Sequence, residues 1–315
     1  MLDQEPAVII FAYKRASSLG QLLNSIRDAE NFRNYQYFIF LDGPKSNEDL
    51  KLVEDVYSIA KRFQSEIGPE KVVIEAQEIN LGLANSVIRG VTQVLDKRDK
   101  AIVLEDDLVI SRKALNYFSR GLEVYSNKKN VGVICGYVPF DMESQNTTFF
   151  INEASSWGWA TWSDRWREAN WDADWLYHEI VNSNRTFYFD QLGTYPFTEM
   201  LRLQKDGALD SWAIRWQASL FLENKLCLYP TKSLITNLGF RGVGTHGTKD
   251  HRYEVDVSQD FDPYFNQIPV LEDFSARVAL SSFYKRLNHE SGIKRIFYKS
   301  LITLKKMAKA LGKRR

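Results

Sequence analysis

Short apolar runs alternate with amphipathic stretches along the first third of the chain. Four runs have the length and composition of buried strands: 7–12, 37–41, 72–74 and 102–104. Between them, apolar residues recur at helical spacing over about 19–26, 47–66 and 83–95, and Ser17 or Ser18 can cap the first of these helices. Strands that alternate with helices predict an α/β fold with a Rossmann-like, mostly parallel sheet flanked by helices.

The second half of the chain has a different pattern. An aromatic run, Trp-Gly-Trp-Ala-Thr-Trp, occupies residues 157–162, and helices are predicted near 197–204 and 211–223. A glycine-rich segment follows at residues 239–247. Because no repeat and no Pro/Ser-rich linker interrupts the chain, we predict one domain over residues 1–275.

Composition places the chain among ordinary globular proteins. Apolar residues make up 44% and charged residues 26% of its 315 positions. The two cysteines, Cys135 and Cys227, lie in apolar runs and are predicted to be small core residues, without a disulfide or zinc pattern. The first residues lack the layout of a signal peptide, and no uncharged apolar stretch is long enough to span a bilayer. We therefore expect a cytoplasmic protein.

Charge is distributed unevenly. The segment 294–315 holds nine Lys/Arg residues and no acidic residue, which leaves 32 basic and 40 acidic residues in the rest of the chain. On a helical projection from Ile293, the apolar residues and the lysines fall on different faces. This pattern predicts that 276–315 is a C-terminal amphipathic helical tail that contacts an anionic membrane surface, and a tail packed on a protein is the alternative. Nucleic acid is not expected as a partner, because the body is acidic.

The run Ala-Ile-Val-Leu at 101–104 leads directly into three carboxylates, Glu105, Asp106 and Asp107. Three like charges at a strand exit repel one another, and a divalent cation with hard oxygen ligands relieves that repulsion. The alternative is a solvated acidic turn. In parallel sheets ligands bind at the carboxyl ends of strands, where Tyr13 and Asp42 also lie.

The motif order resembles that of the nucleotide-sugar glycosyltransferases of the GT-A fold. Asn80-x-Gly82-x-x-Asn85 precedes an apolar strand that ends in the acidic triplet, and Asp42-Gly43 follows the second strand. The Glu-Asp-Asp form, the Gly-Trp segment at 158–159 and the loop at 239–247 are similar to motifs of N-acetylglucosaminyltransferase I. The resemblance, which is to family 2-like enzymes, covers about residues 6–255. It implies a nucleotide-binding half at 1–110 and an acceptor and sugar half at 111–275.

The resemblance implies roles for individual residues. Asp107 is expected to bind Mn²⁺ or Mg²⁺, Asp106 to face the ribose and Glu105 to bind the donor sugar, since phosphates supply most ligands of such an ion. The nucleotide is expected to contact a group of residues at the strand ends and the start of the next helix: Ala12, Tyr13, Arg15, Asp42, Gly82, Asn85 and Arg89. Alternatives stay open for three of them: Arg15 as a surface charge, Asn85 as a loop brace and Arg89 as a solvated residue.

A catalytic base is also implied. Asp210-Ser211-Trp212 at a predicted helix start resembles the Asp-Asp-Trp element that carries the base in the family, with Ser211 in place of its second Asp. An inverting transfer needs such a carboxylate to deprotonate the acceptor hydroxyl. Asp210 is the predicted base and Asp206 the fallback, while an ordinary N-cap is the structural alternative for Asp210.

The glycine-rich segment and the tryptophans complete the predicted site. Arg241 and backbone N–H groups are expected to meet a diphosphate, and His246 to complete the metal shell, touch phosphate or serve a structural role. Trp157 and Trp159 are expected to form a platform for a sugar or to pack in the core.

These features predict an inverting, metal-dependent glycosyltransferase. Its donor is a nucleotide sugar, with a UDP-sugar favoured, and its acceptor is a glycan or lipid-linked glycan of polysaccharide biosynthesis. With the basic tail, this predicts a peripheral protein on the inner face of the cell membrane. A sugar-nucleotide pyrophosphorylase is one alternative, disfavoured because Ala12-Tyr13-Lys14-Arg15-Ala16 has no glycine. A catalytically inactive sugar-binding scaffold is the other.

Overall fold

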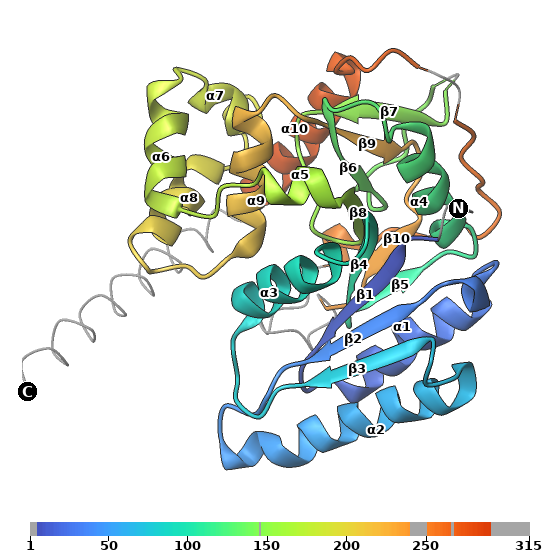
Figure 1. Cartoon of the computed structure of the whole chain (residues 1–315). Coiled ribbons are helices and arrows are strands. Elements are labelled where there is room, and N and C mark those ends of the chain that lie inside the picture. Colours follow the sequence, from blue (N-terminus) through green and yellow to red (C-terminus); the bar gives the residue numbers. More distant parts are fainter. Residues whose placement is uncertain (1–4, 145, 240–250, 266–267, 291–315) are drawn as a thin grey trace, which may run out of the picture.

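The computed structural model describes residues 5–144, 146–239, 251–265 and 268–290. Its centre is an eight-stranded sheet of order β3-β2-β1-β4-β8-β6-β9-β7, and β5 and β10 form a separate antiparallel pair (Figure 1). The strands are β1 Ala7–Ala12, β2 Tyr37–Leu41, β3 Val72–Ala76, β4 Lys100–Glu105, β5 Leu108–Ile110, β6 Val131–Cys135, β7 Thr148–Ile151, β8 Trp159–Trp162, β9 Leu226–Pro230 and β10 Ile235–Asn237.

The half of the sheet built from β3, β2, β1 and β4 is entirely parallel. All four strands coincide with the predicted apolar runs, and β1 is buried at every position. Beyond β4 the sheet is mixed, because β8 runs antiparallel to both β4 and β6, and β7 runs antiparallel to β9. The parallel half therefore brings the ends of β1, β2 and β4 to one edge, as predicted.

Helices cover both faces of the sheet. The α-helices are α1 Ala16–Asp28, α2 Leu50–Ile67, α3 Leu83–Leu95, α4 Ala114–Val124, α5 Ser163–Arg167, α6 Ala173–Asn182, α7 Thr186–Phe189, α8 Phe197–Lys205, α9 Trp212–Leu222 and α10 Phe274–Glu290. Short 3₁₀ turns lie at η1 Phe32–Asn34, η2 Asn47–Asp49 and η3 His251–Tyr253. Core residues of α1, α2 and α4 pack on one face, and those of α3, α9 and α10 on the other.

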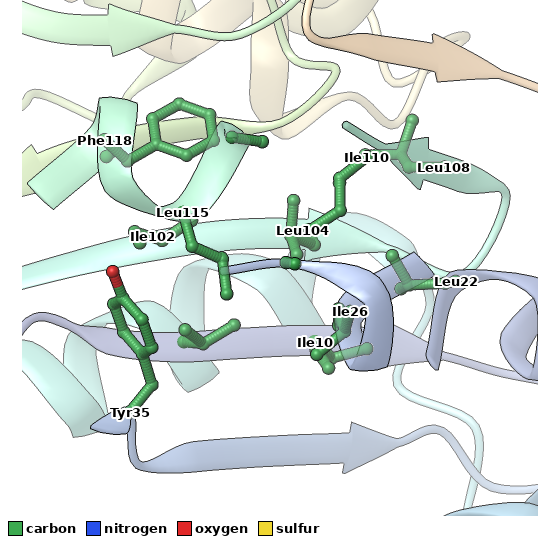
Figure 2. Packing of buried hydrophobic residues seen from close by; sticks show 14 of the residues in the cluster. Ile10, Leu22, Ile26, Tyr35, Ile102, Leu104, Leu108, Ile110, Leu115 and Phe118 are labelled. Atoms are coloured by element: carbon green, nitrogen blue, oxygen red, sulfur yellow. The ribbon is translucent and has the colours of Figure 1, made fainter. Parts of the chain in front are cut away.

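Figure 2 shows the first of these interfaces from close by. Leu22 and Ile26 of α1 point towards Ile10 of β1, and Leu104 of β4 lies between them and the side chains of α4. Residues Ile10, Leu22 and Ile26 have no exposed surface, and each such side chain contributes about 1.5–3 kcal/mol relative to an exposed one. This apolar layer fixes the parallel strands whose ends carry the polar residues.

Two details of the helices differ from the sequence prediction. Neither Ser17 nor Ser18 caps α1, because the helix begins at Ala16 with Arg15 at its N-cap and no side-chain cap. The predicted helix over 47–66 begins as η2 and becomes α-helical only at Leu50. The first difference places Arg15 at the junction of β1 and α1, where its side chain is free to reach the sheet edge.

A tryptophan cluster anchors α9 to the sheet. Trp159 of β8 is buried and stacks on Trp212 at a ring-centroid distance of 5.3 Å and on Trp166 at 5.7 Å. Trp216, one turn after Trp212, lies 6.1 Å from Trp159. The core alternative for Trp159 is therefore confirmed, as is the core position of Cys135 and Cys227.

The start of the segment predicted as a tail lies in α10. Ala276, Leu280, Phe283 and Leu287 are buried against the sheet face that α3 and α9 also cover. The basic amphipathic segment itself, residues 293–311, lies outside the described residues. Within the described part of the chain, no helix combines the length and the apolar character needed to cross a membrane.

Candidate active site

The ends of β1, β2 and β4 meet at one edge of the sheet. The backbone N–H of Asp42 donates to the carbonyl of Ala12 at 3.0 Å, and that of Asp106 donates to the carbonyl of Phe11 at 3.0 Å. Asp42 and Asp106 therefore flank the end of β1 on opposite sides. The structure thus brings Ala12, Asp42 and Asp106 together at this edge of the sheet.

The carboxylate of Asp42 holds the loop at residues 80–82. Its Oδ1 accepts from the N–H groups of Gly43 at 3.0 Å and Leu81 at 2.7 Å. Its Oδ2 accepts from Asn80 Nδ2 at 2.9 Å and from the N–H of Gly82 at 3.0 Å. A carboxylate has about four lone-pair sites, and all are used here. Asp42 thus positions the loop, and the expected contact with a nucleobase stays a prediction.

Asp210 lies across the loop from Asp42. A Cβ atom on Gly82, whose φ is +80°, would be 3.6 Å from Asp210 Oδ2. Asp210 is exposed, and Arg215 Nη2 lies 3.8 Å from its Oδ1. The N-cap of α9 is Ser211, whose side chain accepts from the N–H of Ile214, so the cap does not account for Asp210.

The fallback base, Asp206, has a different environment. Arg202 donates to Asp206 Oδ2 at 2.6 Å along α8. Its carboxylate is therefore engaged in an i,i+4 helix pair. The geometry favours Asp210 as the carboxylate of this edge.

The acidic triplet turns inward at the end of β4. Asp106 is 2% exposed, and its two oxygens accept hydrogen bonds from the Nη2 and Nε atoms of Arg15. Asp107 Oδ2 accepts from Arg15 Nη1 at 3.1 Å. The other oxygen, Asp107 Oδ1, is buried and has no hydrogen-bond partner among the described residues. A solvated acidic turn is therefore not what the structure shows.

Burial shifts the protonation of the triplet. Removal from water raises the pKa of Glu105 to about 8, and the charges of Asp107 and Asp106 add to the shift. Removal from water likewise raises the pKa of Asp106 to about 6, although Arg15 opposes this. Burial alone would lower the pKa of Arg15, but the two aspartates raise it above its usual range. One guanidinium therefore only partly compensates the three carboxylates.

The donor set at Asp107 fits a divalent cation. Its Oδ1 has no hydrogen-bond partner among the described residues and is a hard-oxygen ligand, and Gly239 approaches the carboxylate so closely that a Cβ there would lie 2.5 Å from Asp107 Oδ2. No cluster of three or more His, Cys, Asp or Glu side chains placed to share an ion occurs within the described ranges. The arrangement suits an ion that takes one protein carboxylate and its other ligands from a bound phosphate.

Asn237 is a site residue that the sequence did not single out. It is buried at the end of β10, and its Oδ1 accepts from the N–H of Gly239 at 2.7 Å. The N–H of Leu238 also donates to the carbonyl of Asp107 at 2.8 Å. Asn237 thus fixes the start of the glycine-rich segment beside Asp107. The sequence signal that could have identified Asn237 is its position as a polar residue just before the glycine-rich segment.

Tyr13 is held by Asp49, a second residue that the sequence did not indicate. Tyr13 OH donates to Asp49 Oδ2 at 2.6 Å, and Lys14 Nζ lies 2.8 Å from Oδ1. The bond from Lys14, with that from Tyr13, lowers the pKa of Asp49 to about 2, while burial and Asp49 raise the pKa of Tyr13 to about 12. Stacking of Tyr13 on a base stays a prediction.

The remaining predicted residues lie in different surroundings. Asn85 is exposed and donates to the carbonyl of Leu81 at 3.0 Å, which supports its role as a loop brace. Arg89 is exposed and lines a pocket with Asp42 and Ser86, whose buried Oγ has no partner in the described chain. Trp157 is half-buried, with ring contacts at 4.6 Å to Tyr137 and 5.4 Å to Tyr253. Arg241 and His246 lie outside the described residues.

Comparison with known proteins gives distant structural likenesses. No protein-family model matches the chain, and no curated protein matches it. The chain is similar to the structure of S. aureus TarS 1–349, with 11% identity and a TM-score of 0.41 over 75% of this chain and 60% of that one. For another structure of S. aureus TarS the values are 13% identity and a TM-score of 0.31, over 48% of this chain and 25% of that one. The chain thus spans less than two thirds of the length of either neighbour.

Proposed function

We propose that this protein is an inverting, metal-dependent glycosyltransferase of the GT-A type. It transfers a sugar from a nucleotide donor, which we propose is a UDP-sugar, to a glycan or lipid-linked glycan of polysaccharide biosynthesis. The observation that supports this most is Asp107, whose buried Oδ1 has no partner among the described residues, at the sheet edge to which Asp42 also belongs and near which Gly82 and Asp210 lie. The order of these motifs in the sequence agrees with the proposal.

The cation site serves the leaving group. When bound to Asp107, Mn²⁺ or Mg²⁺ acts as a Lewis acid that neutralises the charge of the departing nucleoside diphosphate. Asp106 is proposed to meet the ribose and Glu105 the donor sugar. Asp42 holds Gly82, which has φ +80°, and a Cβ on Gly82 would lie 3.6 Å from Asp210 Oδ2, so the loop lies beside the proposed base.

Asp210 is proposed as the base. It accepts the proton of the acceptor hydroxyl as the hydroxyl oxygen attacks the anomeric carbon from the face opposite the diphosphate. Arg215 Nη2 lies 3.8 Å from Oδ1 of this carboxylate. Ser211 supports the position of Asp210 because it caps α9 and thereby fixes the chain that enters the helix.

Release of UDP from a panel of UDP-sugars tests the function. We expect release by the full chain with Mn²⁺ and a glycan acceptor, and loss of release in EDTA. Asp210→Asn should lose about 10²–10⁴-fold in transfer while it still binds UDP, because general-base catalysis contributes that much. The matched control is Asp206→Asn, which should transfer normally. If the protein instead forms nucleotide sugars from sugar phosphates, it is a pyrophosphorylase. If it only binds sugars, it is an inactive scaffold.

We also propose that the chain is a peripheral protein of the inner membrane face through its basic C-terminal segment. The proposal rests on the amphipathic pattern of residues 293–311 and their high lysine content. Deletion of residues 293–315 should release the protein from vesicles that contain anionic lipid, measured by co-sedimentation. Equal binding of both forms to such vesicles would contradict this role.

A further inference from the structure

Arg15 occupies the space between the two aspartates of the proposed cation site. It lies three residues after the end of β1 and forms the N-cap of α1 with φ −111° and ψ 72°. From there its guanidinium donates to both oxygens of Asp106 and, at 3.1 Å, to Asp107 Oδ2. The Arg15 side chain is 22% exposed, and those of Asp106 and Asp107 are 3% and 14% exposed. This is a largely desolvated ion-pair group and not a surface charge.

The neighbouring lysine shows that this placement is specific. Lys14 carries the same charge one residue earlier, yet its Nζ pairs with Asp49 at 2.8 Å on the η2 side of β1. Of the two adjacent cations, Arg15 alone is directed at the acidic triplet. A planar guanidinium presents a rigid fork of donors that can bind carboxylates in a bidentate way, whereas an ammonium group is a compact point charge without that fork.

Arg15 contacts only one oxygen of Asp107. The guanidinium contacts Oδ2, whereas Oδ1 is buried without a partner among the described residues. A divalent cation at Oδ1 therefore need not displace Arg15 to reach its ligand. It would instead lie within a few ångströms of a fixed positive charge, and at this separation in a partly buried site the repulsion is substantial.

We propose that Arg15 is a built-in counter-cation that weakens metal binding until a nucleoside diphosphate is present. Without ligand, Arg15 neutralises part of the charge of Asp106 and Asp107 and opposes a second cation. The diphosphate supplies new anionic oxygens that attract the guanidinium and the metal together, so each ligand strengthens the binding of the other. Release of Asp106 from Arg15 would also free the carboxylate for the ribose contact. This inference rests on the proposed function, since it assumes a metal and a diphosphate at this edge.

Binding of Mn²⁺ to the full chain, measured by calorimetry with and without UDP, tests the proposal. Arg15→Gln should bind Mn²⁺ alone about tenfold more tightly than the wild type, and the enhancement by UDP should fall by about the same factor. Arg15→Lys keeps the charge but not the paired contacts, so its affinity should lie between the two. Lys14→Gln, which removes the same charge one residue away, should bind Mn²⁺ as the wild type does.

The outcomes separate this inference from the proposed function. If Arg15→Gln binds Mn²⁺ no more tightly than the wild type, or if Lys14→Gln shows the same gain, Arg15 is not a competing cation. If Arg15→Gln does not fold, Arg15→Met, which also removes the charge, decides, and unchanged Mn²⁺ affinity in that variant would overturn the inference. If Arg15→Gln binds Mn²⁺ more tightly but the wild type turns over no UDP-sugar, the result would support the inference and contradict the proposed function.

Discussion

At the residue scale, the site is built from carboxylates with different tasks. Asp42 uses both oxygens to hold a loop, Asp49 holds Tyr13, and Asp107 leaves one buried oxygen without a partner in the described chain. All three residues are aspartates, so the residue type alone does not distinguish their roles. Only their hydrogen-bond partners separate a positioning residue from a candidate ligand, and those partners come from chain segments up to 92 residues apart.

The positioning role of Asp42 predicts a loss of stability on its removal. Asp42→Ala removes the acceptor of four hydrogen bonds, three from backbone N–H groups. A net hydrogen bond is worth about 0.5–1.5 kcal/mol, and part of the loop can bond to water instead, so we expect a loss of about 2–4 kcal/mol in the free energy of unfolding. Urea denaturation measures it.

The control for this variant is Asp55→Ala. Asp55 pairs with Lys51 on the exposed surface of α2, and such pairs contribute less than about 1 kcal/mol. Equal losses in both variants would show that the bonds of Asp42 do not stabilise the loop.

At the element scale, the approach of α3 to the sheet depends on one glycine. A Cβ on Gly90 would lie 2.8 Å from Phe11 and 3.2 Å from Phe40, whose rings stack on each other with centroids 5.4 Å apart. Because α3 follows directly after Gly82, we expect this contact also to affect how far the loop at residues 80–82 lies from the sheet. The periodicity of residues 83–95 predicted the helix, but nothing in it indicated such a close approach.

We therefore expect Gly90→Ala to destabilise the protein. The added methyl group forces the aromatic pair or the helix to move, which costs about 1–3 kcal/mol in the free energy of unfolding. Gly20→Ala is the matched control, because Gly20 lies inside α1 with no atom within 4 Å of an added Cβ.

The control should change stability in the opposite direction. Replacing an unhindered helical glycine by alanine stabilises a protein by about 0.4–1 kcal/mol. Thermal or urea unfolding of the two variants gives both signs in one experiment. A Gly90→Ala protein as stable as Gly20→Ala would contradict the close packing of α3.

At the scale of the whole molecule, the first half of the fold could be read from the sequence and much of the second half could not. Apolar runs identified β1 and β2 with their observed bounds, because strands buried on both faces need continuous apolar sequence. The antiparallel insertion of β8 between β4 and β6 depends on long-range pairing that a local pattern does not contain. The arrival of Asn237 beside Asp107 depends on another long-range pairing, that of β10 with β5.

The assembled molecule brings the candidate residues to one edge of its central sheet (Figure 1). Asp107 comes from the end of β4, Asp42 from the end of β2 and Asp210 from the chain before α9, which the tryptophan cluster holds against β8. The proposed function requires that this edge bind a nucleoside diphosphate through a metal ion on Asp107.

The direct test is a calorimetric titration with UDP. It compares the wild-type chain with Asp107→Asn, each in Mn²⁺ and in EDTA. We expect the wild type to bind UDP at least tenfold more tightly with Mn²⁺ than with EDTA. Asp107→Asn should lose this gain because the ion loses its carboxylate ligand. Circular dichroism should show that the variant is folded. Equal UDP affinity with Mn²⁺ in both proteins, or no effect of Mn²⁺ on the wild type, would contradict the claim.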